Sequence, residues 1–390
     1  MKIRALRATP VNIPFVAPYR FSYGSIASLT KTIIEVETED GVVGLGECAD
    51  GDRAADVLAM AEKVIGHDVR ATTPMRQRLE PGMGYTPWGN VIAARRVFAG
   101  IEMACWDARG KTEGAPLHLL LGGVVRDRIA LTEYFSYRLP GPRHPGEATP
   151  LAVARSCAAM IEAYGSTIFE GKVATVAMDE EVTLLREVRA AIGDRELRLD
   201  ANGGYTVPTA REALRRFAPF RPTWFEEPVE TYEEMAALRP HTDISFSAHR
   251  VDLPRAVELR APDCIVTNVN ELGGIAGAQS FIRACEAMGV GFRFHSGETG
   301  VGSAACLHLS AALEHVRGAS QTLFHWYADD VIDGGPHRLD GGFTSVPQGP
   351  GLGVTLDPVA LSRCHQRYRD EGAFPSGRQG ESYGGRFRKI

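Results

Sequence analysis

Six polar side chains recur along the middle of the chain at nearly even intervals, each close behind a short apolar run. They are Lys172, Asp200, Glu226, His249, Asn268 and His295, and subtraction of their residue numbers gives steps of 28, 26, 23, 19 and 27 residues. A step of this length fits one strand followed by one helix. Because the carboxyl ends of the strands of a parallel β/α barrel share one mouth, we expect the six groups to lie together.

The residue types at these positions suit a divalent-metal site with acid–base groups beside it. Asp200, Glu226 and His249 follow consecutive predicted strands and would offer two carboxylates and one imidazole to the metal. Oxygen ligands favour Mg²⁺ or Mn²⁺, and an imidazole shifts the preference toward Mn²⁺, Fe²⁺ or Zn²⁺. Lys172 would lie on one side of the metal and His295 on the other. A divalent cation lowers the pKa of a nearby lysine, which can then remove a proton.

Such a site suits a carboxylate substrate. The proton α to a carboxylate is weakly acidic, and a cation bound to both carboxylate oxygens can hold the doubly charged enediolate that forms when the proton leaves. The predicted chemistry is therefore proton removal next to a carboxylate.

The elements that would position these groups alternate regularly from residue 129 onward. Short apolar runs predict eight strands, and the segments between nearly all of them have helical periodicity. The expected strands are 129–134, 167–169, 197–200, 223–226, 244–247, 265–267, 291–294 and 321–324, and the expected helices are 150–164, 179–192, 208–217, 232–238, 254–259, 275–288 and 301–315. With no GxGxxG motif after a strand, this pattern favours a closed parallel barrel over an open doubly wound sheet.

The first third of the chain predicts a second, α+β domain. Strand patterns at 2–13, 30–36 and up to Glu47 surround an Asp-Gly turn, and helical patterns cover 53–111. We expect a capping domain of residues 1–125, completed by 346–390, around a barrel of 126–345. The aromatic and cationic segment 17–24 is expected as a loop, either an ordinary surface loop or a lid that contacts substrate. The tail after Gly372 is expected to be mobile.

The composition excludes several classes of protein. The chain is 44% hydrophobic and 23% charged with a net charge of −5, which is ordinary for a globular protein and gives no footprint for nucleic acid or an anionic membrane. Seven scattered cysteines without a CxxC pair indicate reduced, buried thiols. The N-terminus lacks the apolar core of a signal peptide, and no run of about 18 apolar residues occurs. We therefore expect a cytoplasmic protein.

Several short motifs together resemble those of a known family. They are Glu170-Gly-Lys172 in place of a Lys-x-Lys motif, Leu199-Asp200-Ala-Asn202, Trp224-Phe-Glu226-Glu-Pro228, Leu272-Gly-Gly274, His295, Gly44-Leu-Gly-Glu47 and Pro350-Gly-Leu-Gly353. Over almost the whole chain this set resembles the enolase superfamily, in its mandelate racemase/muconate lactonizing enzyme branch, and is most similar to the acid sugar dehydratases of the glucarate dehydratase type. The resemblance implies a modified TIM-type (β/α) barrel with an α+β capping domain, Mg²⁺ as cofactor, a lyase activity and a homo-oligomer.

The chain departs from the family pattern at three positions. His249 stands where a third carboxylate ligand is usual, which leaves Mn²⁺ or another divalent metal open. Asn268 replaces the aspartate that would pair with His295; an amide can orient the ring but cannot stabilise its charged form. Glu170 replaces the first lysine of the motif, and a carboxylate there would raise the pKa of Lys172 if it lies close.

These departures favour dehydration of a sugar acid, an aldarate or an aldonate. Lys172 is the candidate base, and His295 is better suited to protonate a leaving hydroxyl. Racemisation or epimerisation is an alternative, although it needs two competent bases. The other alternative is a relative that binds a sugar acid without catalysing a reaction.

The remaining assignments concern neighbours of these groups. Polar residues expected to contact the substrate are Arg20, Tyr23, Tyr134 and Glu298, the last of which is equally well a loop carboxylate. Residues expected to support the metal ligands are Asn202, Glu227 and Glu170. A one-residue slip of the strand would exchange Glu226 and Glu227, and His249 is either a ligand or a neighbour of one. His308, His315 and His325 are expected to be structural.

Overall fold

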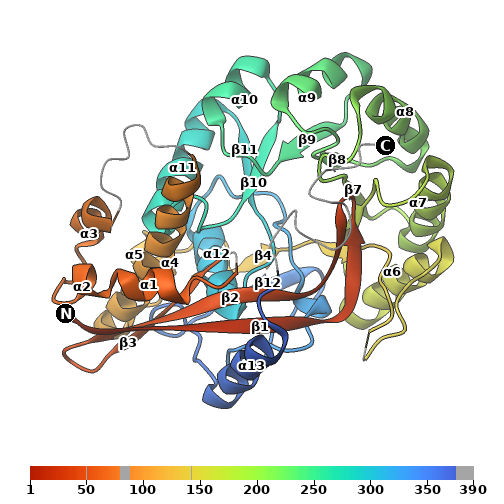
Figure 1. Cartoon of the computed structure of the whole chain (residues 1–390). Coiled ribbons are helices and arrows are strands. Elements are labelled where there is room, and N and C mark those ends of the chain that lie inside the picture. Colours follow the sequence, from red (N-terminus) through yellow and green to blue (C-terminus); the bar gives the residue numbers. More distant parts are fainter. Residues whose placement is uncertain (50, 80–87, 142, 375–390) are drawn as a thin grey trace.

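A computed structural model describes residues 1–49, 51–79, 88–141 and 143–374. Its N-terminal part is an antiparallel sheet in the order β1-β2-β3, formed by β1 (Ile3–Phe21), β2 (Gly24–Thr38) and β3 (Val43–Cys48). In Figure 1 the hairpin of β1 and β2 runs along the lower side of the molecule and bends up toward β7.

The expectation of a loop at 17–24 was wrong, because β1 continues to Phe21 and the hairpin turns only at residues 22 and 23. The strands shift register between Pro14 and Tyr19 and then pair again, with Tyr19 opposite Ile26. Aromatic packing holds this extension, since the Tyr19 ring lies 5.0 Å from that of Trp326 in the barrel. The segment is therefore the tip of a long hairpin docked on the barrel.

The helices of this part cover one face of the sheet. They are α1 (Ala54–Ala59), α2 (Ala61–Val64), α3 (Thr72–Leu79), α4 (Trp88–Glu113) and α5 (Leu117–Leu120), as the helical periodicity predicted. A Cβ on Gly44 or Gly46 would lie 2.0 Å from a carbonyl oxygen of α4, so the Gly-Leu-Gly motif lets the sheet and the helix touch directly.

The barrel is built from seven parallel strands in the order β11-β10-β9-β8-β7-β6-β5. The strands are β5 (Glu133–Phe135), β6 (Ile168–Lys172), β7 (Glu196–Asp200), β8 (Trp224–Glu226), β9 (Ser245–Ala248), β10 (Cys264–Thr267) and β11 (Gly291–Phe294). The helices are α6 (Pro150–Tyr164), α7 (Met178–Ile192), α8 (Val207–Phe217), α9 (Tyr232–Leu238), α10 (Leu253–Leu259), α11 (Ile275–Met288) and α12 (Gly300–Ala312), and short 3₁₀ turns η1 (Ala218–Phe220) and η2 (Arg239–His241) follow α8 and α9. Figure 1 shows the helices outside the curled sheet.

Local sequence sets the helix ends. Thr231 accepts a hydrogen bond from the backbone N–H of Glu234, whose side chain bonds back, so α9 begins with a capping box. Gly289 follows α11 with a φ of +70°, which stops that helix. Such signals explain why most predicted helix bounds agree with the structure.

The predicted eighth strand was wrong. Residues 321–324 form no strand, and the 3₁₀ turn η3 (Phe324–Trp326) begins there because the Thr322 hydroxyl accepts a hydrogen bond from the backbone N–H of Phe324. Ser320 makes a single parallel bridge to Leu131, and the backbone N–H of Gln321 donates to the carbonyl of Phe294 at 2.9 Å. These few bonds close the seam between β11 and β5.

The first predicted barrel strand is divided. Its beginning is β4 (Arg128–Ala130), which pairs antiparallel with β12 (Phe343–Ser345) and lies outside the seven-stranded sheet. Only β5 joins the barrel, by pairing with β6.

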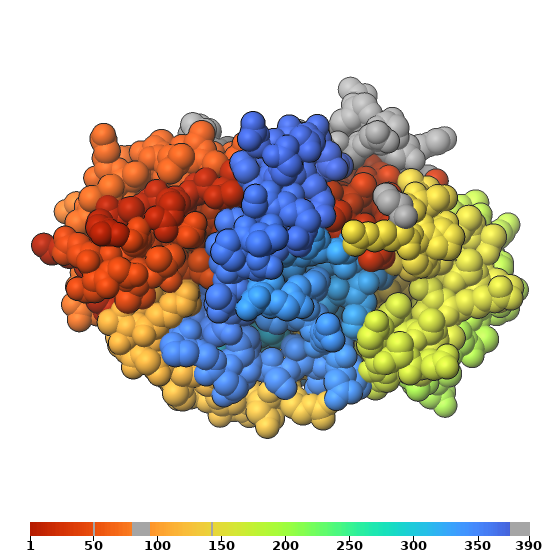
Figure 2. Space-filling model, turned by 90° about the horizontal axis from the view of Figure 1, so that it is seen from below, coloured from red at the N-terminus to blue at the C-terminus, as the bar shows by residue number. Residues whose placement is uncertain are grey.

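The last described helix, α13 (Pro358–Glu371), packs on β1, where His365 hydrogen-bonds the carbonyl of Pro10 at 2.7 Å. In Figure 2 this C-terminal segment lies between the N-terminal part and the α6 and α7 units of the barrel. The expected domain boundaries stay a prediction, and most of the tail expected to be mobile lies outside the described residues.

All seven cysteines are buried and free, as expected. No helix in the described ranges combines the length and the apolar character that crossing a bilayer needs.

Candidate active site

Three of the predicted groups end neighbouring strands in register. Lys172 pairs with Asp200, and Asp200 pairs with Glu226, so the three side chains leave the sheet at one level. Glu226 is buried in the strand, whereas Glu227 follows it with a φ of +36° and accepts a hydrogen bond from the backbone N–H of His249 at 3.0 Å. The register thus directs Glu226, and not Glu227, beside Asp200.

A cluster of three carboxylates forms the floor of this mouth. Glu170, Asp200 and Glu226 each offer an oxygen within 4.8 Å of the others, and all three residues are buried. Gln321 donates hydrogen bonds from its amide nitrogen to both Glu170 and Glu226, the latter at 2.8 Å. The Oε2 atom of Glu170 has no hydrogen-bond partner. We call these three carboxylates the mouth cluster.

The charges of the mouth cluster are poorly compensated. Burial, followed by repulsion from Asp200 and Glu170, raises the pKa of Glu226 well above its usual value. Burial also raises the pKa of Glu170, although Arg293 and Arg198 oppose that shift. Buried like charges with an oxygen that lacks a partner fit a divalent cation, which carboxylate oxygens bind well.

Lys172 and Asn202 both contact Asp200. The Lys172 ammonium donates a short hydrogen bond to Asp200 and lies 5.0 Å from the centre of the Tyr134 ring. Burial opposes its charge, but the anions around it, Asp200 first, raise the pKa of Lys172 well above its usual value. Asn202 donates to both oxygens of Asp200, at 2.7 and 3.0 Å, and so fixes that carboxylate.

The opposite side of the mouth carries two histidines whose ring centres are 4.6 Å apart. Nδ1 of His249 lies 2.8 Å from the carbonyl of Val266, which leaves its Nε2 for other contacts. His249 does not belong to the group of described residues whose ligand atoms already lie together. Burial, the charge of His249 and that of Lys172 hold the pKa of His295 well below its usual value.

The expected hydrogen bond between Asn268 and His295 is absent from the described part of the chain. Asn268 instead accepts a bond from the backbone N–H of Glu271 at 3.0 Å, which stabilises the turn before Gly273. Nδ1 of His295 is left without a hydrogen-bond partner. The side chain of Asn268 therefore shapes the loop, and does not orient the ring.

The residues expected to contact substrate are placed differently from one another. Tyr134 is buried above Lys172, and Tyr23 lies half-buried at the hairpin tip against Phe21. Arg20 is exposed, and strand alternation directs it away from the face of Tyr23. Glu298 is buried and lines a small cavity of about 20 Å³, with room for about one water molecule.

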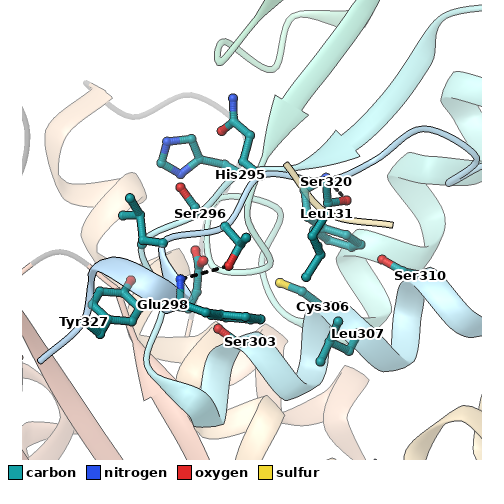
Figure 3. A pocket seen from close by; sticks show the side chains of 16 residues that line it. Leu131, His295, Ser296, Glu298, Ser303, Cys306, Leu307, Ser310, Ser320 and Tyr327 are labelled. Carbon is teal, nitrogen blue, oxygen red and sulfur yellow. Dashed lines mark hydrogen bonds between the residues drawn. The ribbon is translucent and has the colours of Figure 1, made fainter. Parts of the chain in front are cut away.

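Figure 3 shows this cavity, with His295 and Ser296 on one side and Cys306, Leu307 and Ser310 of α12 on the other. The cavity is too small for a sugar acid. It lies behind the mouth and does not represent the substrate site.

Sequence reasoning missed two residues of the site. Gln321 holds two members of the mouth cluster, and its place at the start of the last predicted strand, 321–324, was the available signal. Tyr19 lies close enough to Lys172 and Asp200 for their charges to act on its hydroxyl, whose pKa burial raises. Alternation with Phe21 could have indicated Tyr19 had the segment been recognised as a strand.

Comparisons with known proteins agree with this geometry. Residues 152–360 match the family model described as enolase C-terminal domain-like, and residues 3–122 match the N-terminal domain of mandelate racemase/muconate lactonizing enzyme. A probable glucarate dehydratase of Streptomyces coelicolor is 29% identical over 87% of this chain and 86% of its own length. A D-galactonate dehydratase of Ralstonia nicotianae is 29% identical over 84% and 89%.

Among solved structures, an enolase-family protein of Thermobispora bispora in complex with magnesium and formate superposes with a TM-score of 0.87, at 30% identity over 95% of this chain and 94% of that one. Relatives named dehydratases are hydro-lyases, so the expectation of an enzyme of this class is confirmed. The chain belongs to the enolase superfamily, with the capping domain of its mandelate racemase/muconate lactonizing enzyme branch.

Proposed function

We propose that this protein is a metal-dependent dehydratase of a sugar acid, either an aldarate or an aldonate. The observation that carries the proposal is the mouth cluster with Lys172 on one side and His295 on the other; all but Glu170, which lies two residues deeper in β6, are at the carboxyl ends of barrel strands. The names of the relatives, glucarate and D-galactonate dehydratase, support the same reaction class.

Asp200 and Glu226 are the shared ligands of the proposed metal, Mg²⁺ or another divalent cation. His249, favoured by the sequence, and Glu170, favoured by the geometry, are the two candidates for a third ligand. When bound, the cation offsets the charge of the mouth cluster and of the substrate carboxylate, and competes with Lys172 for Asp200.

Lys172 in its neutral form is the proposed base that takes the α-proton. As the C–H bond breaks, its electron pair forms the C=C bond, and the bond to the β-hydroxyl breaks. His295 provides the proton with which that hydroxyl leaves as water, and the resulting enol becomes a 2-keto-3-deoxy acid. Tyr23 and Tyr134 remain the proposed contacts for the substrate hydroxyls, whereas Glu298, which lines the small cavity, is the loop carboxylate of the two alternatives.

Epimerisation is the second candidate, and the low pKa of His295 favours it, because a neutral imidazole opposite Lys172 can serve as a second base. The test is incubation of the protein and Mg²⁺ with a panel of acid sugars in D₂O. Dehydration predicts 2-keto-3-deoxy products. Exchange of the α-proton without any keto product would instead establish epimerisation. If neither exchange nor a keto product is seen, the remaining candidate is a protein that binds sugar acids without catalysis.

The proposed binding partner of this chain is therefore its substrate, a small carboxylate. The homo-oligomer and the cytoplasmic location stay predictions, which size-exclusion chromatography with light scattering and fractionation of cells can test.

A further inference from the structure

Lys31 is a buried lysine that the proposed mechanism does not use. It lies on β2 opposite Val11 of β1, it is only 6% exposed, and its Nζ is not sealed from solvent. In the described part of the chain Lys31 has no hydrogen bond, and no carboxylate lies within 4.0 Å of its ammonium. Lysine is seldom buried to this degree without a bonded partner, so its retention calls for a reason.

Strand geometry directs Lys31 to the junction between the capping sheet and the segment that follows His295. Leu29, Lys31 and Ile33 alternate onto one face of β2, and Glu47 lies opposite Ile33 on the same face. Leu29 lies beside Gly297, where an added Cβ would be 4.0 Å from its methyl group. Lys31 therefore lies between two neighbours that flank residues 297–302.

Glu47 is the nearest candidate for a structural partner, but its hydrogen-bonding needs are met elsewhere. Its carboxylate accepts from the backbone N–H groups of Thr299 and Gly302 at 3.0 Å each, and from the Thr299 hydroxyl at 2.6 Å. Lys31 makes no hydrogen bond to Glu47; burial raises the pKa of that carboxyl, and Lys31 opposes the rise only by charge attraction. Its charge also lowers the pKa of His295, after burial, His249 and Lys172, in agreement with the face of β2 on which Lys31 lies.

Two other cations near the mouth have anionic partners. Lys172 contacts Asp200, and Arg138 forms an ion pair with Glu147 at 2.6 Å. The charges that dominate the pKa values of Lys172 and Glu226 are other members of the mouth, whereas Lys31 acts on the His295 side. Lys31 thus lies on the His295 side of the mouth, on the face of β2 whose Leu29 lies beside Gly297.

We infer that Lys31 binds the anionic group at the far end of the substrate, and so selects a dicarboxylate sugar acid, an aldarate, over the corresponding aldonate. This inference rests on the proposed function for the reaction, but concerns binding, which can be measured separately. A phosphate ester at the far end offers the same anionic chemistry, and the experiment distinguishes the two sources.

Calorimetric binding in the presence of Mg²⁺ tests the inference with matched pairs of acids that differ only at the far end. The pairs are galactarate with galactonate and glucarate with gluconate, and 6-phosphogluconate represents a phosphate ester. For the wild-type protein we expect one aldarate to bind roughly 30-fold more tightly than its aldonate. This ratio is the lower end of the loss in affinity seen when one partner of a buried charge pair is removed. Tighter binding of the phosphate ester than of both aldarates would overturn the dicarboxylate assignment.

The variants separate binding from structure. Lys31→Met should reduce the preference for the aldarate to about threefold or less. Lys31→Arg should keep most of the preference. The control variant Lys63→Met, which removes an exposed lysine of α2, should keep all of it. The ligand-free Lys31→Met protein should melt at the wild-type temperature or above, because a costly buried charge is gone.

Three outcomes contradict the inference. One is a wild-type protein that binds the two acids of each pair equally, or binds neither. Another is a Lys31→Met protein that keeps the preference. A third is a lower melting temperature with equal loss of affinity for both acids, which would make Lys31 structural. If the preference depends on Lys31 but no acid yields a keto product or proton exchange, the proposed dehydration fails and the role of Lys31 stands.

Discussion

Two groups of buried carboxylates in this chain are satisfied in opposite ways. Glu47 on β3 and Glu102 on α4 reach from the N-terminal part to the barrel, Asp330 lies within the barrel, and each accepts backbone N–H groups at the start of α11 or α12. Glu102 bonds the N–H groups of Ile275 at 2.7 Å and Ala276 at 3.1 Å, and Asp330 bonds that of Gly300 at 2.9 Å. Because helix N-termini favour negative charge, Glu47 and Glu102 hold the two parts together and Asp330 fixes the start of α12.

The mouth cluster is buried to the same degree, but among the described residues only its Asp200 carboxylate accepts a hydrogen bond from a backbone N–H, that of Asn202 at 2.7 Å. Its members share Gln321 and Lys172, repel one another, and leave one oxygen of Glu170 without a partner. Burial alone thus does not separate structural carboxylates from candidate metal ligands. Mutual repulsion together with an unbonded oxygen does, because a cation from outside can compensate both.

The largest expected effect is the loss of the base. Lys172→Ala should reduce α-proton exchange by about 10³-fold or more, because the proposed acceptor of that proton is gone. Exchange in D₂O followed by NMR measures it. The matched control is Lys111→Ala, which removes the partner of the buried Asp107 at 2.6 Å and should lower stability while leaving exchange intact. Wild-type exchange in Lys172→Ala would mean that another residue is the base.

Metal affinity tests the mouth cluster directly. Asp200→Asn should weaken Mg²⁺ binding about 100-fold, measured by calorimetry on the protein after metal removal. Metal addition should raise the melting temperature of the wild type, and this shift should disappear in the variant.

A second pair of variants identifies the third ligand. Glu170→Gln and His249→Asn should differ, with a loss of about tenfold or more in whichever removes a ligand. Equal, unchanged affinity in both would show that neither residue binds the metal.

The carboxylates bonded to helix N-termini should respond in the opposite way. Asp330→Ala leaves the N–H groups of Gly300 and Val331 without their acceptor, and the free energy of unfolding should fall by about 2–6 kcal/mol. Urea unfolding measures this loss. Its Mg²⁺ affinity should stay at the wild-type value, and a drop in affinity equal to that of Asp200→Asn would erase the distinction between the two groups.

The smallest expected effect is on pH dependence. Burial raises the pKa of Glu102 to about 7 from 4.5, so the folded protein binds this proton more tightly than the unfolded chain. Its contribution to stability is full below pH 4.5 and is lost as the pH rises to about 7, by up to about 3 kcal/mol. Glu102→Gln should lack this part of the decrease between pH 5 and 8. Identical pH profiles for variant and wild type would count against the buried acid.

Much of this architecture follows from local patterns. The apolar runs before Asp200 and Glu226 determine the register that brings these side chains together, and a capping box begins α9 at the predicted residue. Such features depend on neighbours in sequence, which is why they could be predicted.

The rest depends on contacts between distant segments. The hairpin extends through Tyr19 because aromatic rings of the barrel receive it, and Asn268 turns from His295 toward Glu271 because a nearby backbone N–H competes for its oxygen. Gln321 joins the site only because the seam brings it beside Glu170. No spacing in the sequence encodes these contacts.

The seam at Ser320 also bears on how firmly the mouth cluster is held. One bridge and a few backbone bonds join the barrel at this seam, without a regular strand, and the amide next to it belongs to Gln321, which holds Glu170 and Glu226. Hydrogen exchange is expected to begin at residues 320–322 sooner than in β7 or β8. When the hydrogen bonds of this seam open, Gln321 can move, and the distance between the candidate metal ligands Glu170 and Glu226 changes with it. The seam is the place where no regular strand completes the ring.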